Sequence, residues 1–142
     1  MAAIDESTAC LRLIGDDLDP DEITRILGSA PTRSERKGDV TRGQHSGLTR
    51  TAKMGSWRLE APQCQPGDID GQVARILAML TADLEEWRAL TAKYRVDMFC
   101  GLFMKEANEG VTLSPNTTLE LGRRGILIGF DIYAPFVEPP KT

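Results

Sequence analysis

The sequence predicts an α+β fold: a two-layer sandwich with a mostly antiparallel sheet and helices packed on one face, related to the ferredoxin-like plan. Three observations support this fold class. Five segments alternate or run apolar as β-strands do, and three segments have the caps or the periodicity of helices. Because the strands outnumber the helices that can cross between parallel strands, most neighbouring strands are expected to be antiparallel.

The first two expected elements are a strand over residues 8–15 and a short helix over residues 20–27. Asp19 can accept bonds from the free amides of the first helical turn, and Pro20 has no N–H to leave unpaired. Gly28 can adopt the left-handed conformation that ends a helix.

A similar pattern recurs near the other end of the chain. Ser114 and Pro115 repeat the capping pair, and Gly122 is expected to end this second helix. Since a strand-like run flanks each copy, the fold is expected to contain two related units.

Residues 29–53 lack apolar periodicity and are rich in Pro, Gly, Ser, Thr and Arg, which predicts a long loop that is functional or disordered. The loop is locally basic and is opposed within itself only by Glu35 and Asp39. Its glycine amides and arginines suit an anion such as phosphate or carboxylate. The alternative is a mobile, solvated loop, since no aromatic stacking residue accompanies the charges. The basic residues are Arg33, Arg36, Lys37, Arg42, Arg50 and Lys53.

The middle of the chain predicts a strand over residues 55–61 and a long amphipathic helix over residues 68–94. Trp57 and Leu59 share one face of the strand, and Arg58 lies on the other. The helix is expected to cover the sheet with an apolar stripe that includes Leu77, Leu80, Leu84 and Trp87.

The last third predicts strands over residues 96–104, 111–113 and 126–134, followed by an extended tail over residues 135–142. The first of these strands is apolar on both faces, and Phe99 and Phe103 lie on the face expected to be free of helices.

A sheet face without helices is expected to carry polar and aromatic side chains and to form an interface. Arg12 and Arg58 are placed on it by the alternation, and the candidate interface residues are Phe99, Phe103, Asp131 and Tyr133. Two other interpretations stay open: the loop over residues 29–53 folds over this face, or Asp131 pairs with Arg58. The candidate ligand-binding residues are Arg33, Arg36, Lys37, Arg42 and Arg58.

Composition predicts one domain over residues 1–142, because 41% hydrophobic and 27% charged residues are ordinary for a globular chain of this length. The net charge of −4 argues against nucleic-acid and anionic-membrane binding. Cys10, Cys64 and Cys100 are odd in number and far apart, so neither disulfides nor a zinc site is expected. With no signal-peptide pattern and no apolar run long enough to span a bilayer, a cytoplasmic location is expected.

The chemistry-bearing motifs that identify an enzyme are missing from the sequence. His45 is the only histidine, and no phosphate-binding or dinucleotide-binding glycine motif is present. A Ser-His-Asp or Cys-His arrangement can still be assembled with Ser46 or a cysteine, although a solvated loop histidine is the simpler interpretation. No catalytic residue, metal or cofactor is therefore predicted.

The order of these motifs resembles one known family. A strand, Asp19-Pro20 with Leu27-Gly28, a glycine-rich loop, Ser56-Trp57, a long helix, and a run ending in Phe130-Asp131-Ile132-Tyr133 follow one another as in the bacterial family called domain of unknown function 4279. The second capped helix is one residue shorter than that pattern. The resemblance implies a small α+β domain and brings no catalytic residues with it.

We therefore predict a non-enzymatic binding or interaction domain that self-associates as a homodimer, through its open sheet face or a sheet edge. A second copy of the chain or an unidentified protein is the expected partner. One alternative is a binder of an anionic or phosphorylated ligand through the basic loop. A second alternative is an enzyme whose site is assembled from scattered residues.

Overall fold

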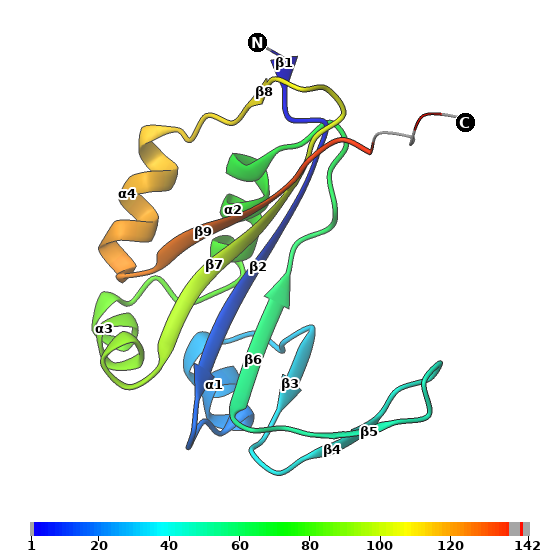
Figure 1. The fold of residues 1–142 in the computed structure, drawn as a ribbon. Helices are drawn as coiled ribbons and strands as arrows, with labels where there is room; N and C mark the ends of the chain where they lie inside the picture. The colour runs from blue at the N-terminus through cyan, green and yellow to red at the C-terminus, as the bar shows by residue number, and fades with distance from the viewer. Residues whose placement is uncertain (1, 137–139, 141–142) are drawn as a thin grey trace.

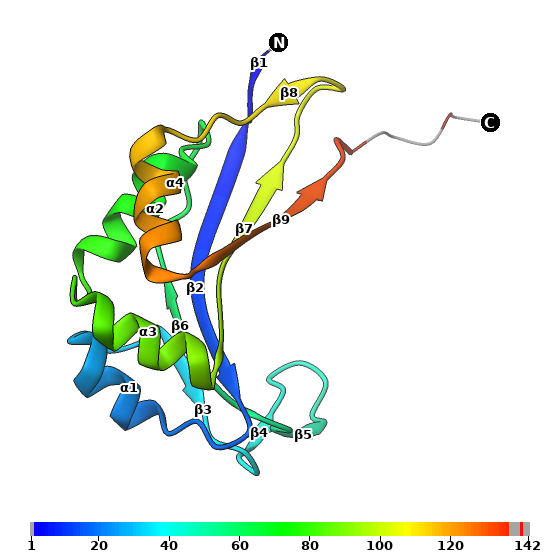
Figure 2. The ribbon, with the colours of Figure 1, turned by 90° about the vertical axis from the view of Figure 1, so that its left-hand side faces the viewer.

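The computed structural model describes residues 2–136 and residue 140. The main sheet has five strands in the order β3-β6-β2-β7-β9, and four helices lie on one side of it (Figures 1 and 2). The strands β3, β6, β2 and β7 are antiparallel neighbours, whereas β9 runs parallel to β7. The predicted α+β class is confirmed. The five strands are β2 (Glu6–Gly15), β3 (Arg33–Glu35), β6 (Gly55–Glu60), β7 (Arg95–Phe103) and β9 (Leu127–Tyr133).

The core lies between the sheet and the helices. Alternate residues of the strands point into it, among them the fully buried Leu11, Trp57 and Met98. Trp57 packs under α1 (Pro20–Leu27), where its Nε1–H donates to Thr24 Oγ1 at 3.1 Å. One face of the sheet is therefore covered by helices, as the alternation predicted.

The two capped helices begin where the sequence predicted. Asp19 accepts a bond from the Asp21 N–H, and α1 ends at Gly28 with a φ of 85°. The helix α4 (Pro115–Arg124) begins at Ser114 but continues through Gly122. The prediction that Gly122 ends it was wrong, because Gly125 adopts the left-handed conformation instead and closes the helix.

The predicted single helix over residues 68–94 is two helices, α2 (Ile69–Ala78) and α3 (Leu84–Lys93). Between them, neither backbone group of Thr81 bonds within a helix. Its N–H donates to the Leu27 carbonyl at 2.9 Å, and its carbonyl accepts from Trp87 Nε1–H at 2.8 Å. Asp83 then caps α3. The apolar period runs through this break because both helices face the same core, which is why the sequence predicted one helix.

The segment over residues 29–53 is not a structureless loop. It adds β3 to the sheet edge and then forms a hairpin of β4 (Val40–Arg42) and β5 (Thr49–Thr51). Figure 2 shows this hairpin on the side of the sheet opposite the helices. Its strands are exposed on both faces, so they have no apolar alternation by which the sequence could reveal them.

The remaining strands form a short pair outside the main sheet, in which β1 (Ala2–Ala3) runs parallel to β8 (Glu109–Gly110). The prediction of a strand over residues 111–113 was wrong, because those residues follow β8 and belong to no strand. None of the described helices combines the length and apolar character needed to cross a bilayer. In the predicted tail, residues 137–139 and 141–142 fall outside the described residues.

Candidate anion-binding site on the open face

The sheet face turned away from the helices, here called the open face, carries a row of three arginines. Arg12 on β2 pairs in register with Arg58 on β6, and Arg58 pairs in register with Arg33 on β3. Side chains directly opposite on neighbouring strands have Cβ atoms about 4.5–5.5 Å apart, and like charges at that spacing repel. This arginine row therefore needs negative charge to offset it.

Arg12 obtains that charge from a neighbouring strand. Its Nε–H and Nη2–H donate to the two carboxylate oxygens of Asp97 on β7, at 2.8 and 2.7 Å. The Asp97 side chain is only 6% exposed and that of Arg12 is 20% exposed. The Arg12 guanidinium also lies 4.3 Å from the centre of the Phe99 ring. These contacts fix Arg12 in place.

The other two arginines are less constrained. Arg33 Nη2–H donates to Glu60 Oε1 at 3.0 Å, and both side chains are exposed. Such exposed pairs contribute little and exchange readily with water. Arg58 is half-buried between its two cationic neighbours and has no ion-pair partner among the described residues. The centre of the row is thus positive and available.

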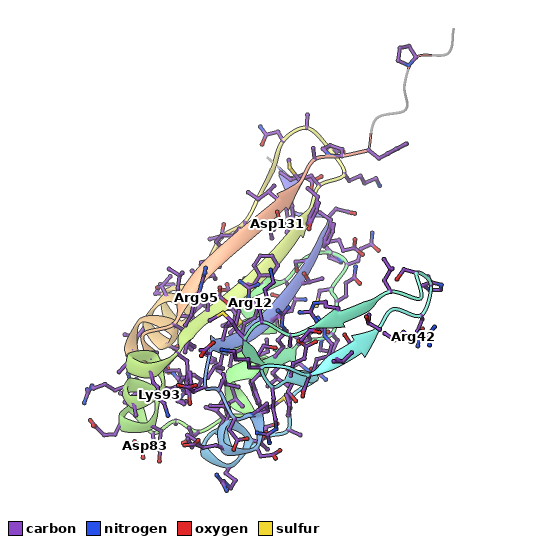
Figure 3. All side chains as sticks on the ribbon, turned by 60° about the horizontal axis from the view of Figure 1, so that its bottom comes forward. Arg12, Arg42, Asp83, Lys93, Arg95 and Asp131 are labelled. Carbon is purple, nitrogen blue, oxygen red and sulfur yellow. The ribbon has the colours of Figure 1, made fainter. Side chains whose placement is uncertain are left out.

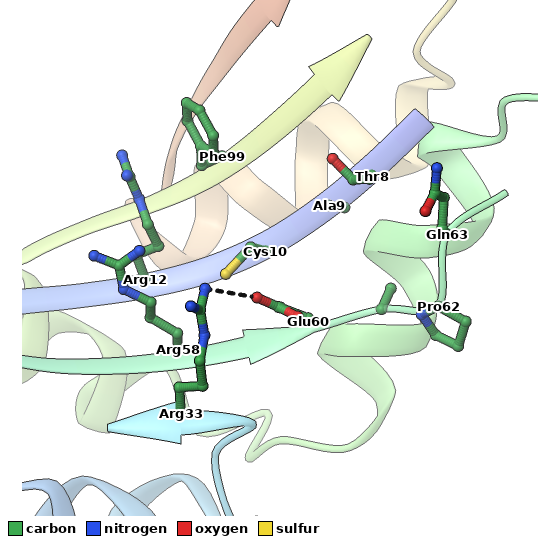
Figure 4. Close-up of a pocket in the computed structure, with 11 residues that line it drawn as sticks. Thr8, Ala9, Cys10, Arg12, Arg33, Arg58, Glu60, Pro62, Gln63 and Phe99 are labelled. Atoms are coloured by element: carbon green, nitrogen blue, oxygen red, sulfur yellow. Dashed lines mark hydrogen bonds and ion pairs between the residues drawn. The ribbon is translucent and has the colours of Figure 1, made fainter. Parts of the chain in front are cut away.

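A cavity of about 510 Å³ opens beside the arginine row (Figure 4). Its polar side chains include the three arginines, Glu60, Gln63 and Thr8, and its apolar wall includes Pro62 and Phe99. A smaller hollow of about 190 Å³ lies beyond it and shares Arg33 and Arg58. Both hollows therefore meet at the same two guanidinium groups.

Cys10 also lines the cavity, but its environment does not favour a nucleophilic thiolate. Burial, and next the nearby Glu60 carboxylate, raise the pKa of the Cys10 thiol to about 11. The neighbouring arginines act in the opposite direction without reversing this. At neutral pH the thiol is protonated, so it offers the cavity a small, weakly polar wall.

The structure brings together two of the five residues predicted to bind a ligand, Arg33 and Arg58. Arg36 and Lys37 lie elsewhere, each paired with carboxylates from outside the predicted loop. Arg36 contacts Asp19 and Asp21, both at 2.7 Å, and Lys37 contacts Asp16 at 2.9 Å. Acidic residues around α1, outside the segment, therefore offset the charge of Arg36 and Lys37 in addition to Glu35 and Asp39 within it.

Arg42 is the fifth predicted residue, and it lies on β4 of the projecting hairpin. Figure 3 shows it well away from Arg12. Arg50, on β5 of the same hairpin, donates from Nη1–H to Glu35 Oε1 on β3 at 2.8 Å. The hairpin therefore supplies no residue to the cavity of about 510 Å³, and its Arg50 lines only the smaller hollow.

The residues predicted for an interface lie on the open face, at β7 and β9. The rings of Phe103 and Tyr133 stack with centres 4.8 Å apart and planes 3° apart. The Tyr133 hydroxyl donates to Asp131 at 2.6 Å, a bond that raises the pKa of Tyr133. Asp131 therefore does not pair with Arg58, and the alternative interpretation that it does was wrong.

Sequence reasoning placed Arg12 on the open face but did not assign it to a ligand site, and it missed Glu60 and Gln63. The alternation gave the face of each arginine, but their alignment depends on strand register, which no sequence pattern here specified. Among the described residues, no three His, Cys, Asp or Glu side chains are grouped so as to hold a metal ion.

The comparison with protein families covers nearly the whole chain. A family model matches residues 5–135, a range that contains all five strands of the main sheet and all four helices. The chain belongs to the family described as Domain of unknown function (DUF4279). The resemblance read from the order of motifs is thereby confirmed. No curated protein and no solved structure matches the chain. Membership of DUF4279 assigns no activity to the chain.

Proposed function

We propose that this chain is a binding domain for a small anionic ligand whose carboxylate or phosphate is held by Arg58 on the open face. The observation that carries the proposal is the position of Arg58: half-buried, in register between Arg12 and Arg33, and without an ion-pair partner among the described residues. An anion bound there removes the repulsion within the arginine row and gains charge-assisted hydrogen bonds.

The three arginines have different roles in this binding. Arg58 supplies the planar pair of donors that matches the two oxygens of a carboxylate or phosphate. Arg33 can turn from Glu60 towards the ligand at little cost, because that ion pair is exposed. Arg12 is held by Asp97, so it contributes a fixed positive charge and its remaining N–H groups.

The cavity indicates the rest of the ligand. Its volume of about 510 Å³ lies within the range of roughly 300–1,000 Å³ that small-molecule sites occupy. Pro62 and Phe99 offer apolar contact on one side of the anion, and Glu60 accepts hydrogen bonds on another. We therefore favour an organic acid or phosphate ester with an apolar body and at least one donor group over a bare inorganic ion.

The experiment is calorimetric titration and thermal denaturation with inorganic phosphate, small organic carboxylates and phosphate monoesters. At least one of these is expected to bind, to raise the melting temperature, and to lose affinity as the salt concentration rises. The Arg58→Gln variant should lose that binding, whereas Arg42→Gln on the hairpin should retain it. Binding that survives Arg58→Gln but is lost in Arg36→Gln or Arg42→Gln would place the site between residues 36 and 42 and contradict the proposal.

The expected self-association, through the open face or a sheet edge, remains a prediction. Phe99 is covered by Arg12, and Phe103 and Tyr133 stack on each other, so these aromatic groups already have partners within one copy. The open face is therefore better suited to a polar ligand than to a large apolar interface.

A further inference from the structure

The two edges of the main sheet differ in a way that points to a partner. The edge strand β3 has only three residues, Arg33, Ser34 and Glu35, and short charged edges resist pairing with other chains. The opposite edge strand, β9, has seven residues and contains no lysine, arginine or proline. An edge of that length without such residues is a template for another strand.

Exposed apolar side chains gather on β9. Leu127 and Ile132 are each 60% exposed, Tyr133 is 47% exposed and Phe130 is 40% exposed. They lie on both sides of the sheet, with Leu127 and Tyr133 on the open face and Phe130 and Ile132 on the helix side. On the helix side a hollow of about 330 Å³ adjoins them, walled also by Leu102 and Met104. The edge is thus apolar above and below its unpaired backbone.

The free backbone groups belong to alternate residues of β9. The Tyr133 carbonyl accepts from the Met104 N–H at 3.1 Å, so the odd-numbered residues turn their backbone groups towards β7. By alternation, Ile128, Phe130 and Ile132 turn theirs outwards. These are the residues that a new strand can pair with.

We propose that the strand added at this edge is β9 of a second copy. The two β9 strands pair antiparallel about a two-fold axis at Phe130. Phe130 then pairs with itself, Ile128 with the second Ile132, and Leu127 with the second Tyr133. The only charged side chain of β9, Asp131, faces the second Gly129, so no like charges meet. The strand is therefore complementary to itself, as a two-fold contact requires.

This pairing joins the two main sheets into one and is independent of the anion site. Arg58 lies on β6, separated from β9 by β2 and β7. The cavity beside the arginine row therefore stays open in the dimer, and failure of either proposal leaves the other standing.

Sedimentation of the purified chain at micromolar concentration tests the pairing. Wild type is expected to be a dimer, and Phe130→Lys and Ile132→Lys are expected to be folded monomers by circular dichroism. Leu48→Lys is the control, because Leu48 is 72% exposed in the β4–β5 hairpin, which lies far from β9 (Figure 1), and should leave the dimer intact. A monomeric wild type, or a dimer that survives both β9 variants, would overturn the proposal.

Cysteine cross-linking tests the register. With the native cysteines replaced by serine, Phe130→Cys should form an intermolecular disulfide. The Cα atoms of residue 130 in the two copies form a hydrogen-bonded antiparallel pair and lie about 5.5 Å apart. Ile132→Cys is the matched control. Ile132 lies opposite Ile128 of the second copy, so the two introduced cysteines would be four residues apart along the strand, about 14 Å, and should not cross-link. Cross-linking of Ile132→Cys in place of Phe130→Cys would rule out this two-fold axis.

Discussion

Arg58 lies directly opposite Arg12 in the antiparallel pairing of β2 and β6, and only Arg12 of the two has a carboxylate partner among the described residues. Without a bound anion, the charge of Arg58 therefore has no carboxylate partner of its own among the described residues, although it lies between two other arginines. Three neighbouring arginines lower the stability of the ligand-free fold and raise its affinity for an anion. Such a loss of stability in exchange for function is expected at a binding site.

The first prediction concerns that repulsion. Arg58→Gln should stabilise the ligand-free protein by about 0.2–1 kcal/mol, because it removes like charges from opposite positions on neighbouring strands. Urea denaturation at low salt measures the change, and high salt should reduce it. Arg42→Gln, on the exposed hairpin, serves as the control. A destabilised Arg58→Gln variant would mean that Arg58 already has a favourable partner.

The second prediction concerns the ion pair of Arg12 and Asp97. Arg12→Met should cost about 3 kcal/mol, since it leaves the 6% exposed Asp97 carboxylate without its main partner. Arg12→Met with Asp97→Leu should be more stable than Arg12→Met alone, because no buried charge is then left unpaired.

Arg95→Met is the control for this pair. Arg95 is 3.9 Å from Asp97 but 68% exposed, so its loss should cost no more than about 1 kcal/mol. Equal losses for Arg12→Met and Arg95→Met in urea denaturation would contradict the assignment.

The third prediction follows from the break between α2 and α3. Leu80 is buried in the core, whereas Leu84 is half-buried at the start of α3. Leu80→Ala should cost about 2–5 kcal/mol and Leu84→Ala clearly less. Denaturant midpoints compare the two variants directly. A single continuous helix would instead make the two losses similar.

The fourth prediction is a pH dependence at Asp70. Its carboxylate accepts bonds from the Thr117 hydroxyl at 2.7 Å and the Ser114 N–H at 3.0 Å, which hold the pKa of Asp70 below its ordinary value of 3.8. A lowered folded-state pKa gives stability that is present above the unfolded-state pKa and is lost as the pH falls through the folded-state pKa.

Asp70→Asn should therefore be less stable than wild type at neutral pH, and the difference should shrink in strong acid. Urea midpoints measured from about pH 7 down to about pH 2 test this. A difference that does not change across that range would show that Asp70 carries no linked proton.

The sequence predicted the layers of this fold because its signals are local. The Asp19-Pro20 and Ser114-Pro115 caps start α1 and α4, and alternation placed Trp57 in the core with Arg58 opposite. The break at Thr81 depends on a bond to the Leu27 carbonyl, a contact between distant segments that periodicity does not contain.

The site was only partly predictable for the same reason. Arg33 and Arg58 were assigned to a ligand, but the basic character of residues 29–53 also drew in Arg36, Lys37 and Arg42. Carboxylates around α1 pair with Arg36 and Lys37, and Arg42 lies on the hairpin, away from the cavity. Arg12, Arg33 and Arg58 are neighbours because of the register in which their strands pair. That register is set by contacts between segments distant in the sequence.

Anion binding at Arg58 is measured most directly by a titration with inorganic phosphate and a phosphate monoester, followed by NMR of the arginine Nε–H groups. The Arg58 resonance is expected to move most, those of Arg33 and Arg12 to move with it, and those of Arg36 and Arg42 to stay in place. Movement confined to Arg36 and Arg42, or no movement of Arg58 with any anion that binds, would contradict the assignment of the anion site to Arg58.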